Sequence, residues 1–218
     1  MISFFDLILL VFTGVTIGIS GAMIPGSLTL FTVSEALKTN RFAGLKIILG
    51  HIVLEFVLIG VILLGFQKFL SSKRFILAVS IIGGLALIIM GIILLLNAAR
   101  MKLSDKKTDS GFNRGLVIGG IFFSIISPGF LVWWATIGVS TVIRALLFGI
   151  TGVIVLTLGH WLADIFWYWS ISYAVDKGKT YISDRSYQNV MRFFSVLLII
   201  LGLYFLINSL SQNLCRYV

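Results

Sequence analysis

The sequence predicts an all-α integral membrane protein with six transmembrane helices. Of its 218 residues, 59% are hydrophobic and only 11% are charged, and the mean hydropathy is +1.09. Soluble domains average about 45–50% apolar and about 25% charged residues, so this composition indicates a chain surrounded by lipid. A spanning helix needs about 20 apolar residues, which leaves room for six spans and excludes a large soluble catalytic domain.

Six apolar runs are each long enough to cross a bilayer. Lipid offers the backbone no hydrogen-bond partners, so each run is expected to be helical. The runs lie near residues 5–34, 46–66, 75–97, 115–140, 147–172 and 192–210. We expect a single transmembrane domain over 1–218, with a first half over about 1–99, a cytoplasmic connector over about 100–114 and a second half over about 115–218.

Basic residues are concentrated on the first, third and fifth connectors. Cytoplasmic loops of membrane proteins carry an excess of Lys and Arg, so these connectors are expected inside the cell, with both termini outside the plasma membrane. The same distribution accounts for the net charge of +9 without nucleic acid as a partner. The basic residues on these connectors are Lys38, Arg41, Lys46, Arg100, Lys102, Lys106, Lys107, Arg114, Lys177, Lys179, Arg185 and Arg192.

Both prolines of the chain lie inside apolar runs, and each is followed by glycine. Proline removes a helical hydrogen bond and clashes with the preceding turn, so the first and fourth helices are expected to break there. Backbone groups freed by a break must face protein or a wet cavity, and we expect both breaks to line one shared cavity. The segments concerned are Pro25-Gly26-Ser27 and Ser127-Pro128-Gly129.

A second motif occurs once in each half. The pattern G-H-x-x-x-[E/D] places His51 four residues before Glu55 in the second run, and His160 four residues before Asp164 in the fifth. Helical spacing of four residues puts each histidine and its acid on one face. Three helices per half would make the second half enter the membrane from the opposite side, which is an inverted repeat typical of secondary transporters.

Intramembrane acids are costly, and they usually mark a function. Burial disfavours the charged carboxylate, which makes Glu55 and Asp164 candidate proton carriers. The simpler alternative is polar glue between helices, with each acid hydrogen-bonded to its own histidine. Aromatic residues near the end of the fifth run, Trp167, Tyr168, Trp169 and Tyr173, are expected to form an interfacial belt.

The motifs resemble those of the LysE-type translocators, in particular the group found in archaea. The similar segments are SGAMIPGSL (20–28), GHIVLEF (50–56), SPGFLVWWATIG (127–138) and GHWLADIFWY (159–168). The resemblance implies two inverted halves and export of a small solute, typically an amino acid, driven by proton entry. The family usually has Pro-Gly-Pro at the first break and Asn-Pro at the second, where this chain has Ser27 and Ser127.

Other functions stay open at this stage. His51, Glu55, His160 and Asp164 would suit a first-row divalent metal, either as a transported ion or in an intramembrane metalloenzyme. The enzyme is the weaker alternative because the chain lacks H-E-x-x-H, and no cofactor is expected. A lone cysteine, Cys215, excludes dithiol chemistry within one chain. The small-residue face from Gly84 to Gly91 would serve a homodimer or packing within the chain.

Overall fold

The computed structural model describes residues 3–101 and 114–214, which are almost entirely helical. Most of the expected connector 100–114, together with Cys215 and Arg216, lies outside the described residues. The elements are α1 (Phe4–Ala22), α2 (Ser27–Lys38), α3 (Ala43–Val61), the π-helix η1 (Ile62–Phe66), α4 (Gln67–Leu70), α5 (Lys73–Ala98), α6 (Arg114–Ile125), α7 (Pro128–Trp133), the π-helix η2 (Trp134–Gly138), α8 (Val139–Leu146), α9 (Gly149–Gly178), the 3-10 helix η3 (Lys179–Tyr181) and α10 (Asp184–Leu214).

Within the described residues, six helical segments are long and apolar enough to cross a membrane. They are Phe4–Ala22, Ala43–Leu70, Lys73–Ala98, Pro128–Leu146, Gly149–Tyr181 and Asp184–Ser209. The prediction of six apolar helices is therefore confirmed, and the protein is a multi-pass membrane protein. The first and fourth spans are shorter than the expected apolar runs 5–34 and 115–140, because the break at each proline divides the run into separate helices.

The expected breaks are present at both prolines. Residues 23–26 separate α1 from α2, and residues 126–127 separate α6 from α7. Ser127 caps α7 by accepting a hydrogen bond from the amide of Phe130, and Pro128 occupies the first turn, where a missing N–H costs nothing. A hydrogen bond from Ser27 Oγ to the carbonyl oxygen of Phe123, 2.7 Å long, joins the start of α2 to the end of α6.

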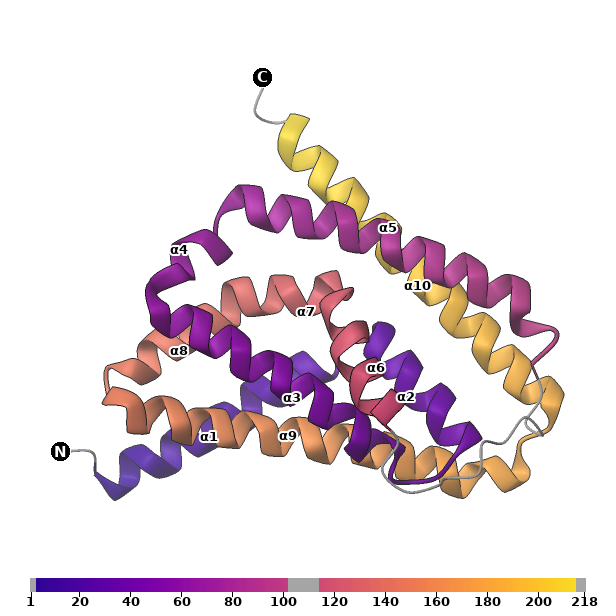
Figure 1. Ribbon diagram of the computed structural model, residues 1–218, viewed down its shortest axis with the longest axis horizontal. Helices are drawn as coiled ribbons and strands as arrows, with labels where there is room; N and C mark the ends of the chain where they lie inside the picture. Colours follow the sequence, from indigo (N-terminus) through magenta and orange to yellow (C-terminus); the bar gives the residue numbers. More distant parts are fainter. Residues whose placement is uncertain (1–2, 102–113, 215–218) are drawn as a thin grey trace.

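The second span contains a further kink. Its helix passes from α3 into the π-turn η1, where Gly65 has a φ of 93°. Glycine adopts this left-handed conformation without the steric cost that a side chain would bring. The short helix α4 therefore leaves the axis of α3 before the chain turns into α5 (Figure 1).

Three helix pairs hold the bundle together. Helix α1 packs along α9, α3 packs along α6, and α5 packs along α10, as Figure 1 shows. Glycines permit the close approach in each pair: a methyl group added at Gly50 would overlap the carbonyl oxygen of Val117, and one added at Gly159 would overlap that of Val11. Gly84 and Gly202 face each other between α5 and α10. Small residues of this kind drive association of membrane helices.

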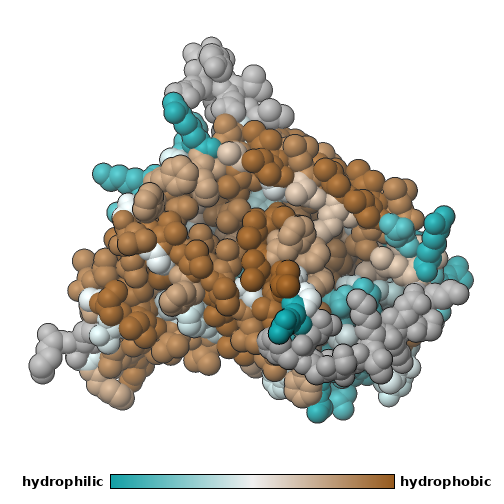
Figure 2. All heavy atoms as spheres, viewed as in Figure 1, coloured by the Kyte–Doolittle hydropathy of each residue, from teal (hydrophilic) through white to brown (hydrophobic). Residues whose placement is uncertain are grey.

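The basic connectors gather at one end of the molecule. The ammonium group of Lys179 donates to the carbonyl oxygen of Thr39 at 2.7 Å, and the Gln188 amide donates to that of Met101 at 3.1 Å. The first contact joins the ends of α2 and α9, and the second joins the end of α5 to the start of α10, at the right of Figure 1. Figure 2 shows the molecule in the view of Figure 1: hydrophobic residues cover most of the visible face, and hydrophilic residues lie toward its edges.

The glycine at the α3–α6 crossing gives a direct test of this packing. Gly50→Ala would push α6 away from α3, and overpacking of this kind typically costs about 1–3 kcal/mol, so the thermal unfolding midpoint in detergent should fall. Gly60→Ala, on the same helix but with no atom within 4 Å of the added methyl group, is the matched control and should leave the midpoint unchanged or raise it. Equal midpoints for the two variants would contradict the packing.

Candidate functional site

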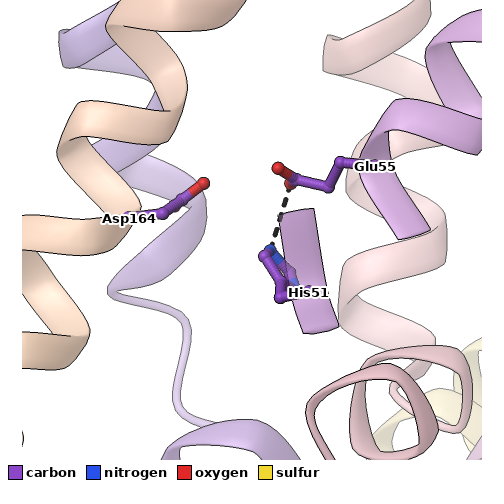
Figure 3. Close-up of side chains that lie close together, drawn as sticks. All are labelled: His51, Glu55 and Asp164. Carbon is purple, nitrogen blue, oxygen red and sulfur yellow. Dashed lines mark ion pairs between the residues drawn. The ribbon is translucent and has the colours of Figure 1, made fainter. Parts of the chain in front are cut away.

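The two G-H-x-x-x-[E/D] motifs meet in the interior. His51 and Glu55 project from α3, and His160 and Asp164 project from α9. All four are buried, with exposed fractions between 1% and 6%. Ligand-type atoms of His51, Glu55 and Asp164 all lie within 4.8 Å of one another, and Figure 3 shows these side chains pointing toward a common centre. Positions 109 residues apart thus form one cluster.

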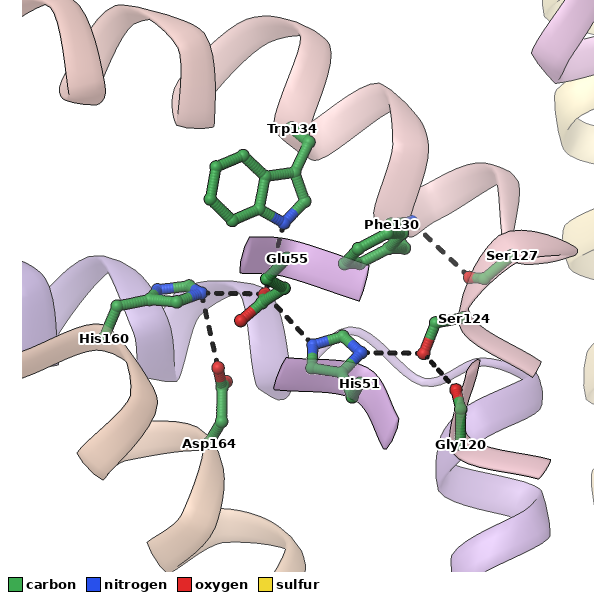
Figure 4. Close-up of polar contacts among 9 residues, drawn as sticks. All are labelled: His51, Glu55, Gly120, Ser124, Ser127, Phe130, Trp134, His160 and Asp164. Atoms are coloured by element: carbon green, nitrogen blue, oxygen red, sulfur yellow. Dashed lines mark hydrogen bonds and ion pairs between the residues drawn. The ribbon is translucent and has the colours of Figure 1, made fainter. Parts of the chain in front are cut away.

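One oxygen atom, Oε1 of Glu55, is the hub of the cluster (Figure 4). It lies 3.1 Å from Nε2 of His51 and 3.0 Å from Nε2 of His160. The indole N–H of Trp134 donates to the same oxygen at 3.2 Å. A carboxylate accepts several hydrogen bonds, and donors arranged in this way stabilise it where water is absent.

The remaining carboxylate oxygens are less well satisfied. Nε2 of His160 lies 3.3 Å from Oδ2 of Asp164, but the geometry is not that of a hydrogen bond. Oδ2 of Asp164 and Oε2 of Glu55 are buried, and neither has a hydrogen-bond partner within the described part of the chain. Buried acceptors of this kind cost about 1–3 kcal/mol each unless a proton or a ligand satisfies them.

The cluster lines a cavity of about 50 Å³, counted as space for the centres of water molecules. One water needs about 10–15 Å³ on this measure, so the cavity has room for about three to five. Among the described residues that line it, none is Lys or Arg. They are Gly21, Ala22, Ile24, Gly26, Leu28, Thr29, His51, Glu55, Ser124, Ser127, Gly129, Phe130, Trp133, Trp134, His160, Asp164 and Tyr168.

A smaller cavity of about 10 Å³ lies beyond the first. Trp133, Trp134 and His160 line both cavities. Its other lining residues include Ile59 and Leu156, each one helical turn from the cluster toward the end opposite the basic connectors. Trp133 stacks on the imidazole of His160, with ring centroids 5.3 Å apart. The two indoles and His160 therefore form a partition between the cavities.

The two breaks border the cavity through some of their residues but not through the prolines. Gly26, Ser127 and Gly129 line the cavity. Pro25, which belongs to a segment expected to line the cavity, is instead exposed and does not line it. Pro128 is buried, but its ring packs against Gly83 of α5 and does not line the cavity. A proline ends a helix through its fixed φ and its missing N–H, and neither effect needs the ring to face the site.

A place in the expected interfacial belt is wrong for Tyr168, which is 4% exposed and lines the cavity. Trp169 and Tyr173 are 38% and 40% exposed, and their place in a belt stays a prediction. The spacing of Tyr168 could have indicated its burial, because residues 160, 164 and 168 lie four apart on one helical face. No local sequence pattern indicated the hydrogen bond from Trp134 to Glu55, because it joins two different helices.

A buried cluster of ionisable residues beside two broken membrane helices is the kind of site found in solute transporters. Comparison with known families agrees, because residues 19–209 match the LysE type translocator family. The chain belongs to this family and is therefore a membrane exporter of small solutes rather than an enzyme. Comparisons with curated proteins and with solved structures gave no match.

Proposed function

We propose that this translocator exports an amino acid or a similar zwitterion in exchange for protons. The observation that carries the proposal is the cavity shared by Glu55 and Asp164, two acids from different helices within 4.8 Å of each other. Two carboxylates this close in a lipid-enclosed protein repel when both are charged. Binding a proton or a cationic group relieves the repulsion, so proton and substrate compete for one site.

The lining of the cavity supports a substrate that carries an ammonium group. Two acids supply negative charge, and the rings of Phe130, Trp133 and Trp134 offer faces suited to a cation. The cavity also reaches the first turn of α2, at Leu28 and Thr29, where free backbone amides favour a carboxylate. Space for about three to five water molecules is enough for the charged head of an amino acid.

The hydrogen-bond pattern also supports proton carriers over polar glue. Acids that serve only to join helices would have their hydrogen-bonding capacity satisfied, whereas one oxygen of each acid has no hydrogen-bond partner in the described part of the chain. The unpartnered Oε2 of Glu55 and Oδ2 of Asp164 are positions at which a proton or a ligand would be stabilised.

We further propose that the two halves are inverted repeats. Gly50 meets Val117 at the α3–α6 crossing as Gly159 meets Val11 at the α9–α1 crossing. At the same two crossings, a methyl group added at Gly120 would overlap the carbonyl oxygen of Ile47, and one added at Gly14 would overlap that of Leu156. Gly50 and Gly159 directly precede His51 and His160, so the correspondence extends to the cluster itself. Alternating access would then arise from one half rocking against the other.

Substitution of the acids tests the proposed coupling. Glu55→Gln and Asp164→Asn keep size while removing the titrating group, so the double variant should lose pH-gradient-driven export in proteoliposomes, down to the rate of protein-free vesicles. Glu35→Gln removes an acid of α2 that pairs with Lys38, outside the cavity, and should transport as the natural protein does. Gradient-driven export by the double variant at the native rate would overturn the assignment.

A second candidate substrate is a divalent metal ion, favoured by the grouping of His51, Glu55 and Asp164. Thermal-shift screening of the purified protein against amino acids and against Zn²⁺, Ni²⁺ and Mn²⁺ separates the two, because a ligand of the folded state raises its midpoint by mass action. We expect an amino acid to raise the midpoint and the metals to leave it unchanged. A rise with metal that disappears in His51→Ala would favour metal export instead.

We also propose that the basic connectors face the cytoplasm and that both termini lie outside. In a Cys215→Ser background, Leu147→Cys lies between α8 and α9, and Ser186→Cys lies near the start of α10, at the basic end. Both positions are exposed. An impermeant thiol reagent added to intact cells should label the cysteine at 147 and not the one at 186. The reverse pattern would show the opposite orientation.

A further inference from the structure

A hydrogen-bonded chain links His51 to the neighbouring helix α6. Nδ1 of His51 lies 2.7 Å from Oγ of Ser124, and this hydroxyl donates to the carbonyl oxygen of Gly120 at 2.6 Å (Figure 4). A carbonyl oxygen only accepts, so the one proton of the hydroxyl is used in that bond. Ser124 is fully buried, at 0% exposed. Its oxygen is left as an acceptor facing the imidazole.

The same arrangement occurs at Ser172, where the roles are unambiguous. Its hydroxyl donates to the carbonyl oxygen of Tyr168 at 3.0 Å and accepts the backbone N–H of Gly44 at 2.7 Å. A backbone N–H cannot accept a hydrogen bond. At Ser172, therefore, a buried serine donates a hydrogen bond to the carbonyl oxygen four residues earlier and accepts one from an N–H of the adjacent helix.

We infer that Ser124 is a positioning residue that holds His51 as the Nδ1–H tautomer, so that His51 and Glu55 together bind one proton. With the hydrogen on Nδ1, a neutral ring presents a bare Nε2 to Glu55 Oε1, 3.1 Å away. Two bare acceptors at this distance repel, whereas one proton on either atom gives a hydrogen bond. The meaning of this proton for transport rests on the proposed function.

The other histidine has no matching hydroxyl. The α1 residue that corresponds to Ser124 by the two helix crossings is Gly18, and a methyl group added there would lie 3.0 Å from Nδ1 of His160. Gly18 has no side-chain acceptor to hold a hydrogen on that nitrogen. His160 can therefore carry its hydrogen on Nε2 and donate it to Glu55 Oε1 at 3.0 Å. The two motifs look alike in sequence, but their neutral rings present different atoms to Glu55: a bare Nε2 from His51 and an Nε2–H from His160.

Within residues 3–101 and 114–214, the ionisable groups around His51 come from two helices. Glu55 faces it from α3, and His160, Asp164 and Tyr168 face it from α9. Helices α6 and α7 contribute the hydroxyl of Ser124 and the ring of Phe130, whose centroid lies 4.9 Å from that of the imidazole. Protonation of the His51–Glu55 pair thus responds to the charge on α9, where Asp164 would hold a substrate ammonium group.

Nitrogen NMR of the histidines tests this assignment in the full-length protein in lipid bilayers. The chain has two histidines, so selective ¹⁵N-histidine labelling gives two rings, and His51→Gln assigns them. We expect Nδ1 of His51 to carry a hydrogen throughout a pH titration, with only Nε2 gaining or losing one. In Ser124→Ala the neutral ring should change to the Nε2–H tautomer, which donates to Glu55.

Ser195→Ala is the matched control. Ser195 is equally buried and donates to the carbonyl oxygen of Met191 at 2.7 Å, but it lies in α10 and does not line the cavity. Its loss should leave both rings unchanged. A bare Nδ1 on His51 in the natural protein would overturn the inference even if Ser124→Ala failed to fold. An unchanged His51 tautomer in a folded Ser124→Ala variant would overturn it as well.

The NMR result does not depend on transport, so the two proposals fail separately. Export that is insensitive to a pH gradient would refute the proposed proton coupling while leaving the tautomer of His51 as measured. If both hold, Ser124→Ala in proteoliposomes should shift the pH dependence of export, because the neutral His51 would no longer require a proton between itself and Glu55. Ser195→Ala should keep the native pH profile.

Discussion

The interior of this translocator depends on the hydrogen bonds that Oε1 of Glu55 accepts. An unpaired carboxylate deep in a lipid-enclosed protein is costly, and its burial requires donors that are already in place. Here the partners of this oxygen come from three segments: Nε2 of His51 on α3, the indole N–H of Trp134 on η2 and Nε2 of His160 on α9. One oxygen atom therefore ties the second span to the fourth and fifth, and movement of any of them changes how well the acid is satisfied.

The glycine at the start of each G-H-x-x-x-[E/D] motif determines which helix the following histidine contacts. Gly50 lets the backbone of α6 approach α3, and the next residue, His51, bonds to Ser124 of that same helix. In the other half, Gly159 admits α1, and His160 then lies beside Gly18 of α1. The close crossing places a ring nitrogen against a neighbouring helix, so packing and polar chemistry are determined together.

Much of this architecture could be predicted from the sequence, because span length, proline breaks and helical spacing of four residues are local properties. The cross-half contact between Glu55 and His160 could not, since the rotation of α3 relative to α9 depends on packing along the whole bundle. The contact of Trp134 with Glu55 depends likewise on the π-turn η2, which no local pattern indicated. Pro25 is exposed for a related reason: its position ends a helix, but the surrounding fold decides where its ring points.

The partition formed by Trp133, Trp134 and His160 has an electrical consequence. A membrane voltage falls mainly across material that excludes water, so connecting both cavities to the surrounding water would concentrate it across the thickness of the two indoles. Moving one elementary charge through the full potential is worth about 2.3 kcal/mol per 100 mV, however short the path. A proton that passes this partition would then gain nearly all the energy that the membrane stores while moving only a few atoms' width.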